Sequence, residues 1–282
     1  MKPRIGITLG DPAGIGPEIV AKALASGQLD RHFDYEVIGD PRTNRRADAA
    51  DWVMAGARRC LAGELAALVT GPVTKELVAP WPGQTEMLAH LSRTKKFAMM
   101  LVGGPLRVAL VTIHVPLARV PKLITARKIL EVTELSHALC RRLGIARPRI
   151  GVAALNPHAG ESGRFGTEEK RIIAPAVRRA DRQLGGVTGP WPADTLFHKA
   201  YHGGFDAVVA MYHDQGLAPL KMIAFDQGVN LTLGLPFVRT SPDHGTAFDI
   251  AGQGIARPDS LIAAINLAAR LAHAKAPRRK GK

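Results

Sequence analysis

Short runs of apolar and often β-branched residues alternate along the chain with longer stretches in which apolar residues recur every three or four positions. The short runs predict strands, the longer stretches predict helices, and their alternation is typical of a layered α/β fold with a largely parallel sheet. The predicted strands cover residues 4–9, 35–39, 65–70, 98–102, 107–113, 149–154 and 207–211. The predicted helices cover residues 17–25, 46–62, 85–92, 125–143, 168–184 and 260–274.

The chain shows no internal repeat and no Pro/Gly/Ser-rich linker long enough to separate independent domains. At 282 residues, of which 46% are hydrophobic, it is long enough to bury a sizeable core. We therefore expect residues 1–282 to form a single catalytic unit, either as one large α/β body or as two lobes folded together.

Lysine and arginine outnumber aspartate and glutamate by 38 to 24, which gives a formal net charge of +14. Such an excess is compatible with a nucleic acid partner or with a small anionic substrate. Much of it lies in helix-like stretches such as Arg45–Arg46, Arg58–Arg59 and Arg141–Arg142 and in the terminal string PRRKGK, where a solvated surface is the ordinary explanation. Because only 5% of the residues are aromatic and no groove-reading motif occurs, we expect a small anion and no nucleic acid partner.

No run approaches the roughly 18 consecutive apolar residues of a membrane span, and the opening MKPRIGITLG lacks the apolar centre of a secretory signal. We therefore expect a cytoplasmic protein with no membrane partner. Cys60 and Cys140 lie far apart without CxxC spacing, so we expect buried thiols rather than a disulfide or a thiolate metal site.

A glycine-rich string, GDPAGIGPEIV, covers residues 10–20 between the first predicted strand and the first predicted helix. Pro17 suits the first helical turn, and the helix N-terminus offers N–H groups to an anion. The spacing differs from GxGxxG, so this string does not predict a Rossmann fold.

Three histidines each follow a predicted buried strand: His114 after VALVTI, His158 after IGVAALNP and His213 after DAVVAMY. One histidine in such a place is more often a hydrogen-bonded structural residue than a ligand, but three in equivalent places favour convergence. Three neutral imidazoles with an open coordination position suit a catalytic divalent ion such as zinc, which polarises an alcohol or carbonyl oxygen. Asp214, beside His213, is expected to orient a ligand or to contact the substrate.

Other polar residues follow strand-like runs. Lys221, Asn230 and Arg239 offer charge and directed donors that suit a phosphate. Gln84 and Thr85 offer neutral hydrogen-bonding groups at the start of a predicted helix, with an ordinary helix cap as the alternative.

The segment SPDHGTAFDIAG contains the small residues Gly245, Thr246 and Ala247. They would let a flat ring or a ribose lie against the backbone, and a tight surface loop is the alternative.

The strings GDPAGIGPE, NPHAGE, PADT, VVAMYHDQG and VNLTLGLPFVRTSPDHGTAFDIAG occur in this order over almost the whole chain. In sequence and spacing they resemble the 4-hydroxythreonine-4-phosphate dehydrogenase family. The opening and the HGTAFDIAG string are also similar to isocitrate and isopropylmalate dehydrogenases. The resemblance implies their α/β fold, with two α/β/α lobes and a cleft between them. The approximate lobes are residues 1–80 with 230–282 on the dinucleotide side and residues 81–229 on the metal and dimer side.

The resemblance also implies an activity. Members of the family oxidise 4-phosphooxy-L-threonine to a 3-oxo acid with NAD, or with NADP in its place, and with a divalent zinc, magnesium or cobalt ion. The 3-oxo acid then loses CO₂ and gives 3-amino-2-oxopropyl phosphate, in the synthesis of pyridoxal phosphate.

The site residues carried over from the family belong to a homodimer with a shared active site. His114 and His158 of one subunit and His213 of the other would hold the metal. The substrate would contact Gln84, Thr85, Asp194, Asp214, Lys221, Asn230 and Arg239, and the dinucleotide would contact Gly245, Thr246, Ala247 and Asp249. The group that accepts the hydroxyl proton stays open, with Asp194, Asp214 and Lys221 as candidates.

The chain departs from the family pattern in two places. It has GQTE where the family usually has GHTE, so that Gln84 replaces a histidine at the substrate site, and it is several tens of residues short after Asp40. Another substrate therefore remains an alternative, such as phosphorylated threonate or erythronate, or a cis-dihydrodiol. A non-catalytic anion-binding protein is the least favoured hypothesis.

Overall fold

The computed structural model describes residues 2–43 and 45–274. Within them the chain forms two compact units, one made of the residues up to 95 together with those from 226 onward, and the other made of residues 96–225. The first unit is thus built from two separate stretches of the sequence. The basic string PRRKGK lies outside the described residues.

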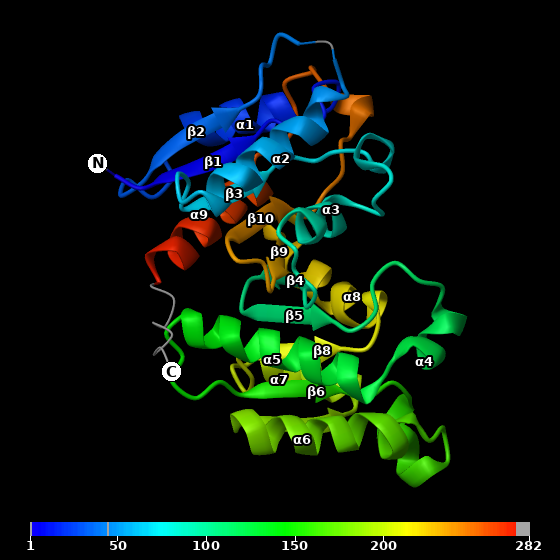
Figure 1. The fold of residues 1–282 in the computed structure, drawn as a ribbon. Helices are drawn as coiled ribbons and strands as arrows, with labels where there is room; N and C mark the ends of the chain where they lie inside the picture. Colours follow the sequence, from blue (N-terminus) through cyan, green and yellow to red (C-terminus); the bar gives the residue numbers. More distant parts are fainter. Residues whose placement is uncertain (1, 44, 275–282) are drawn as a thin grey trace. The chain divides into compact units, whose positions relative to one another are not determined.

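The sheet of the first unit has the strand order β2-β1-β3-β10-β9. All neighbouring strands are parallel except β9, which is antiparallel to β10. The strands are β1 (Arg4–Thr8), β2 (Asp34–Ile38), β3 (Ala67–Thr70), β9 (Val229–Leu233) and β10 (Val238–Pro242). The helices are α1 (Gly16–Ala25), α2 (Asp48–Leu61), α3 (Gln84–Leu91) and α9 (Asp259–His273). Helix α2 packs on β1 and β3, and α9 packs on β10 and β3 (Figure 1).

The sheet of the second unit has the strand order β4-β5-β8-β6-β7, in which only β4 and β5 are antiparallel to each other. The strands are β4 (Ala98–Gly103), β5 (Leu106–Leu110), β6 (Ile150–Ala153), β7 (Val187–Trp191) and β8 (Ala207–Ala210). The helices are α4 (Val120–Leu123), α5 (Ala126–Arg142), α6 (Ala174–Leu184), α7 (Ala193–Tyr201) and α8 (His213–Ala224). Figure 1 shows α5 in front of the strands and α7 behind them.

Each unit has its own apolar core. In the first, Leu68 of β3 is fully buried with Leu88 of α3, and in the second, Leu110 of β5 is buried with Leu196 of α7. Strands β3 and β8 are buried along their whole length, as expected for parallel strands covered on both faces.

The strands and helices predicted from the sequence are present, with ends shifted by a few residues. The pattern did not predict β7, β9, β10, α4, α7 or α8. Strand β10 carries Arg239, Thr240 and Ser241 at fully buried positions, where an alternation of apolar and polar residues gives no signal. Helix α8 contains Gly216 and Pro219, both of which oppose helix formation, so its apolar face in the folded chain outweighs local propensity.

The expectation for the two cysteines is met. Cys60 and Cys140 are free and buried, and burial raises the pKa of Cys60 to about 12 and that of Cys140 to about 11. No helix in residues 2–43 and 45–274 is long and apolar enough to cross a membrane.

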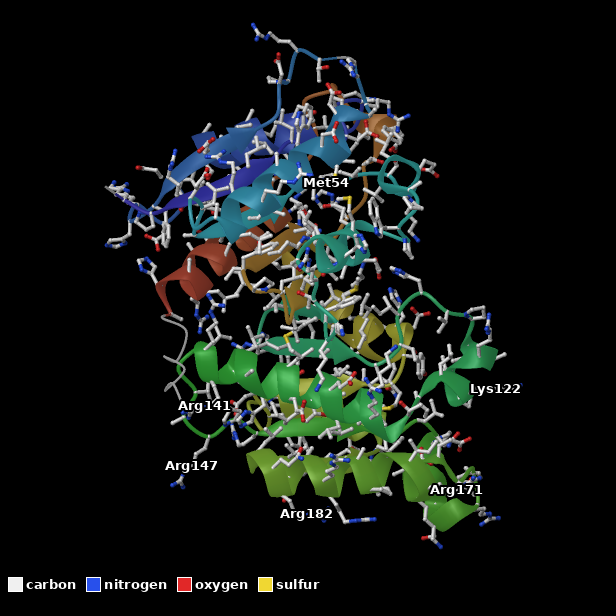
Figure 2. All side chains as sticks on the ribbon, viewed as in Figure 1. Met54, Lys122, Arg141, Arg147, Arg171 and Arg182 are labelled. Atoms are coloured by element: carbon white, nitrogen blue, oxygen red, sulfur yellow. The ribbon has the colours of Figure 1, made fainter. Side chains whose placement is uncertain are left out.

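Several basic side chains of the second unit extend into solvent. Figure 2 labels Arg141, Arg147, Arg171 and Arg182, all of which are exposed. Arg46 of the first unit is also exposed, as expected, and its guanidinium pairs with the fully buried carboxylate of Asp11 at 2.6 Å.

Candidate active site

Three neighbouring parallel strands of the second unit, β5, β8 and β6, lead into the segments that carry His114, His213 and His158. The carboxyl ends of parallel strands meet at one edge of a sheet, and open α/β sheets gather their ligands there. The three histidines therefore follow the same edge of this sheet.

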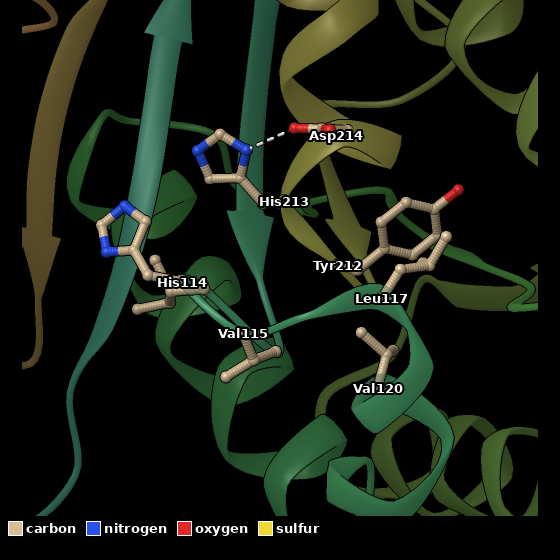
Figure 3. A pocket seen from close by; sticks show the side chains of 8 residues that line it. His114, Val115, Leu117, Val120, Tyr212, His213 and Asp214 are labelled. Atoms are coloured by element: carbon tan, nitrogen blue, oxygen red, sulfur yellow. Dashed lines mark hydrogen bonds and ion pairs between the residues drawn. The ribbon is translucent and has the colours of Figure 1, made fainter.

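His114 and His213 line one pocket, with a volume of about 300 Å³ (Figure 3). Their ring centroids lie 5.6 Å apart. His213 Nδ1 lies 2.6 Å from Asp214 Oδ1, a contact that fixes the ring and makes Nε2 the nitrogen suited to bind a cation. The other lining residues are Ile113, Val115, Leu117, Val120, Tyr212 and Asp214.

Gln215 holds the start of α8 in place. Its Oε1 accepts a hydrogen bond from the backbone N–H of Met211 at 2.7 Å, and its Nε2 donates to the carbonyl of Ala154 at 2.6 Å. The buried amide thus ties the end of β8 to the end of β6. The role of Gln215 is not visible in the sequence, because nothing in the string MYHDQG indicates which polar residue turns inward.

His158 lies in a left-handed turn. The φ angles from His158 to Ser162 are all positive, at 51°, 54°, 80°, 43° and 58°, a region that is disfavoured for residues other than glycine. The glycine of this run, Gly160, has no room for a side chain, because an added Cβ would lie 2.6 Å from Glu169 Oε2. The turn therefore depends on its surroundings rather than on local preference.

Glu169 supplies part of those surroundings. It is 5% exposed, and its Oε1 accepts hydrogen bonds from the backbone N–H of Leu155 at 2.9 Å and of Asn156 at 2.7 Å. Asn156 Nδ2 also donates to Glu169 Oε2 at 3.1 Å. Glu169 thus fixes the residues that precede His158. The sequence does not predict this role, because the string FGTEEK is typical of a solvated charged segment.

The predicted histidine trio does not form a ligand group within one chain, where His114 and His213 come together without His158. In the described part of the chain, the one group of three histidine, cysteine or acidic residues with ligand atoms within 4.8 Å of one another is Asp30, His32 and His273. The imidazoles at the strand ends nevertheless suit a zinc-class cation by chemistry, because imidazole nitrogen is a preferred ligand of such ions.

In the first unit, Arg239 of β10 is a buried cation, 3% exposed. Its Nη2 donates to Thr70 Oγ1 at 2.6 Å and to Gln84 Oε1 at 3.2 Å, and its Nη1 donates to Thr232 Oγ1 at 3.1 Å. These partners are neutral. Burial, partly offset by the charge of Glu86, lowers the pKa of Arg239 to about 10.

Gln84 and Thr85 both belong to this cluster. Gln84 Nε2 donates to the carbonyl of Gly71 at 3.1 Å, so its amide bridges the loop after β3 and the guanidinium of Arg239. Thr85 is 5% exposed, and its hydroxyl lies 3.5 Å from Arg239 Nη1. The structure therefore brings together three of the predicted substrate residues.

Asn230 of β9 is near the same cluster, since Asn230 and Thr232 lie on one face of their strand. Its Oδ1 is buried without a hydrogen-bond partner in the described structure, an arrangement that proteins usually avoid. The remaining candidates lie in the second unit. Lys221 is on α8, with its ammonium 5.8 Å from the centre of the Phe225 ring, and Asp194 is exposed in the first turn of α7.

The glycine-rich loop after β1 meets the HGTAFDIAG loop after β10. The N–H of Ile15 donates to the carbonyl of Thr246 at 2.9 Å, and a Cβ added to Gly14 would lie 2.7 Å from that oxygen. Ala247 has a positive φ of 42°, and Gly245 has open space beside it. Asp249 lies in the short 3₁₀ helix Phe248–Ile250. The strings GDPAGIGPEIV and HGTAFDIAG thus lie against each other in the first unit.

Asp11 and Arg46 form an ion pair beside these two strings. Arg46 pairs with Asp11, and its guanidinium carbon lies 5.0 Å from the centre of the Phe248 ring. Local sequence patterns do not predict this contact, because residues 11, 46 and 248 are far apart in the chain.

The chain matches one protein family over most of its length. The model of a family described as pyridoxal phosphate biosynthetic protein PdxA matches residues 18–268. Relatives named 4-hydroxythreonine-4-phosphate dehydrogenase include one from Geobacter metallireducens, 43% identical over 97% of both chains, and one from Caulobacter vibrioides, 44% identical over 95% of this chain and 97% of its own. The alignment with the first spans 328 positions, more than the 282 residues present here, so that relative carries additional residues.

Solved structures agree. A 4-hydroxythreonine-4-phosphate dehydrogenase from Klebsiella pneumoniae is 39% identical with a TM-score of 0.85, over 96% of this chain and 98% of its own. A terephthalate 1,2-cis-dihydrodiol dehydrogenase from Burkholderia xenovorans is 29% identical with a TM-score of 0.68, over 95% and 97%. An isocitrate dehydrogenase from Methylococcus capsulatus, 15% identical over 98% of this chain and 86% of its own, has a TM-score of 0.55 and shares the fold alone. The predicted isocitrate dehydrogenase-like α/β fold is thereby confirmed, and the chain belongs to the PdxA family of pyridoxal phosphate biosynthetic proteins.

Proposed function

We propose that this protein is a 4-hydroxythreonine-4-phosphate dehydrogenase that uses NAD, or NADP in its place, and a divalent cation. The observation that carries the proposal is the buried guanidinium of Arg239, which is bonded to neutral groups and so keeps a positive charge available to an anion. The names of the relatives, 41–44% identical, support the same substrate.

The phosphate of the substrate would bind at the Arg239 cluster, with Thr85 and Gln84 donating or accepting hydrogen bonds beside it. Asn230, whose buried Oδ1 lacks a partner, would accept a hydrogen bond from the substrate. The ammonium group of Lys221 would place a second positive charge beside the substrate.

His114, His158 and the partner subunit's His213 would hold the cation, which when bound lowers the pKa of the substrate hydroxyl and polarises the carbonyl that forms. Asp214 orients the ring of His213 through the contact at Nδ1. Asp194, Asp214 and Lys221 are the candidates for accepting the hydroxyl proton.

The dinucleotide would lie against Gly245, Thr246, Ala247 and Asp249. Small side chains at residues 245–247 let a ribose or ring approach the backbone, and the hydrogen bond from Ile15 to Thr246 supports the loop. The homodimer with a shared site and the cytoplasmic location are parts of this proposal.

The test is a spectrophotometric assay of NAD reduction by the purified protein. Metal-stripped protein would be supplied with zinc, magnesium or cobalt and with 4-phosphooxy-L-threonine, phosphorylated threonate, phosphorylated erythronate or a cis-dihydrodiol. We expect the highest kcat/KM with 4-phosphooxy-L-threonine, and no turnover with any substrate in the absence of metal. A higher kcat/KM with the dihydrodiol would replace the proposal by the activity named for the Burkholderia xenovorans structure.

Gln84 provides a separate prediction about substrate choice. The amide oxygen of Gln84 accepts a hydrogen bond from Arg239 at any pH. An imidazole in its place can become positively charged. We expect Gln84→His to change the ratio of kcat/KM values between 4-phosphooxy-L-threonine and the phosphorylated four-carbon acids by roughly tenfold, equivalent to about 1.4 kcal/mol. Identical ratios for the two proteins would show that residue 84 does not select the substrate.

A further inference from the structure

A second group of metal-binding side chains lies in the first unit, separate from the residues assigned to the reaction. Asp30 and His32 belong to the loop between α1 and β2, and His273 is the last residue of α9. His32 Nδ1 lies 2.7 Å from Asp30 Oδ1, and His273 Nε2 lies 3.3 Å from Asp30 Oδ2. One ligand atom from each residue lies within 4.8 Å of the others.

These distances are close to those of a filled site. Zinc binds imidazole nitrogen and carboxylate oxygen at about 2.0–2.2 Å, which places neighbouring ligand atoms of a tetrahedral site roughly 3.4 Å apart. Small rotations of the side chains would therefore bring all three around one ion. Two imidazoles and one carboxylate favour a zinc-class cation over magnesium, which prefers oxygen ligands.

The three side chains are held in place by neighbouring groups. Asp30 Oδ1 accepts a hydrogen bond from the backbone N–H of His32 at 2.9 Å, and Tyr35 donates from its hydroxyl to the carbonyl of Asp30 at 2.7 Å. The ring of His273 packs edge-on against Phe33, with centroids 4.5 Å apart, and Phe33 is 4% exposed. Holding ligands before the ion arrives reduces the entropy lost on binding.

The group also joins two segments that are distant in the sequence. The loop after α1 and helix α9 already share a hydrogen bond, from Asn266 Nδ2 to the carbonyl of Gln28 at 3.0 Å. We infer that Asp30, His32 and His273 bind a divalent zinc-class cation that fastens the end of α9 to this loop. The side chains of His32 and His273 are 80% and 49% exposed, so an ion can reach them from solvent.

The alternative is an ion-pair network in which protonated histidines pair with Asp30. Exposed pairs of this kind contribute little stability, and they need no metal. Zinc addition distinguishes the metal site from the ion-pair network, because zinc binds neutral imidazoles and competes with protons for them.

The test uses the full-length protein carrying His158→Ala, which removes one ligand of the proposed catalytic metal. Zinc would be titrated into this metal-stripped variant by isothermal titration calorimetry, and thermal unfolding would be followed with and without zinc. We expect saturable binding and a zinc-dependent rise in melting temperature. Adding His32→Ala or His273→Ala should weaken zinc binding at least about tenfold and abolish the rise.

His90→Ala is the matched control, an exposed histidine of the same unit outside this group. It should leave zinc binding unchanged, and His32→Ala in the otherwise native protein should leave the dehydrogenase kcat/KM unchanged. Equal zinc affinity with and without His32 and His273 would overturn the inference, as would no zinc-dependent rise in the His158→Ala protein. Neither result would bear on the proposed activity, which the NAD-reduction assay tests separately.

Discussion

Arg239 is a buried cation whose hydrogen-bond partners are hydroxyl and amide oxygens. Buried charges in proteins are usually paired with an opposite charge, because an ion loses its hydration when it is buried. Charge-assisted hydrogen bonds to Thr70, Thr232 and Gln84 stabilise the guanidinium without neutralising it. The residue therefore favours binding of an anion more strongly than an exposed arginine would.

Arg239→Met tests this role. We expect kcat/KM to fall by about 10- to 100-fold, mainly through a higher KM, because a charge-assisted hydrogen bond is worth about 1.5–3 kcal/mol. The melting temperature should change little, since replacing a buried charge by an apolar side chain of similar length is often neutral. Steady-state kinetics and thermal unfolding measure both effects, with exposed Arg171→Met as the control. A normal KM in Arg239→Met would contradict the assignment.

Glu169 holds the residues that precede His158, and we expect it to position His158 rather than to contact the substrate. Glu169→Gln keeps the shape of the side chain but removes its negative charge. The carboxylate oxygen that accepts hydrogen bonds from the N–H groups of Leu155 and Asn156 becomes a neutral amide oxygen. We expect cobalt affinity, measured from the visible absorption of the bound ion, to fall roughly 10- to 100-fold. The melting temperature should fall by a few degrees at most. Glu131→Gln, on α5 of the same unit, should bind cobalt normally, and equal affinity in the Glu169 variant would disprove the positioning role.

Local sequence patterns indicate some residues of the candidate site and not others. The places of His114, His158 and His213 after buried strands could be predicted, because each follows an apolar run that forms a strand. Glu169 and Gln215 could not, since a buried glutamate or glutamine has the same appearance in a sequence as an exposed one. Their importance comes from hydrogen bonds to backbone groups of other segments, which local patterns do not encode.

At the scale of elements, Asp206 fastens the start of β6 beside β8. Its side chain is 16% exposed, and Oδ2 accepts hydrogen bonds from the backbone N–H of Arg149 at 2.8 Å and from Arg149 Nε at 3.2 Å. Burial raises the pKa of Asp206, but the hydrogen bonds and charge of Arg149 outweigh it, so the pKa lies below its usual value. The carboxylate therefore stabilises the fold in its ionised form.

The sign of the pH dependence follows from this lowered pKa. The stabilisation is complete above the unfolded-state pKa of about 4 and is lost as the pH falls through the lower folded-state value. We expect Asp206→Asn to be less stable than wild type by about 1–3 kcal/mol at pH 7, because the N–H of Arg149 loses a charged acceptor. Urea unfolding at a series of pH values should show this difference shrinking below about pH 4. A difference independent of pH would exclude the ionised carboxylate as its source.

Element prediction succeeded where burial and propensity agree, as for β3, whose residues ALVT are all apolar or β-branched and all buried. It failed for β10, in which Arg239 and Thr240 are buried and satisfied by hydrogen bonds, Thr240 Oγ1 donating to the carbonyl of Ala264 at 2.8 Å. It also failed for α8, where Pro219 lies inside the helix. Both failures lie in segments that carry proposed site residues.

At the scale of the whole molecule, the proposed shared site predicts complementation between subunits. His158→Ala and His213→Ala would each be inactive alone. Mixed after reversible dissociation, they should regain roughly a quarter of wild-type activity, because half of the dimers are mixed and each mixed dimer has one intact site. NAD reduction and size-exclusion chromatography measure the result. Recovery of no activity in verified mixed dimers would show that each subunit supplies its own histidines.

The fold class could be predicted because the sequence strings typical of the family occur in the same order along nearly the entire chain. The family match to residues 18–268 rests on the same similarity. The ends of the two compact units depend on contacts between segments that are distant in the sequence, which local patterns do not encode. The first stretch of the first unit runs to residue 95 and so includes α3. The side chains of α3 pack with those of α2 and β3.

Strand β10 lies between β3 and β9, and both β9 and β10 come from the part of the chain after residue 226. During synthesis on the ribosome, β1, β2 and β3 emerge early, yet β3 keeps an open, apolar edge until translation is almost finished. Residues 96–225, by contrast, are contiguous and can fold as soon as they emerge. The nascent chain would thus carry an unpaired strand edge for most of its synthesis, the kind of surface that chaperones bind and that promotes aggregation.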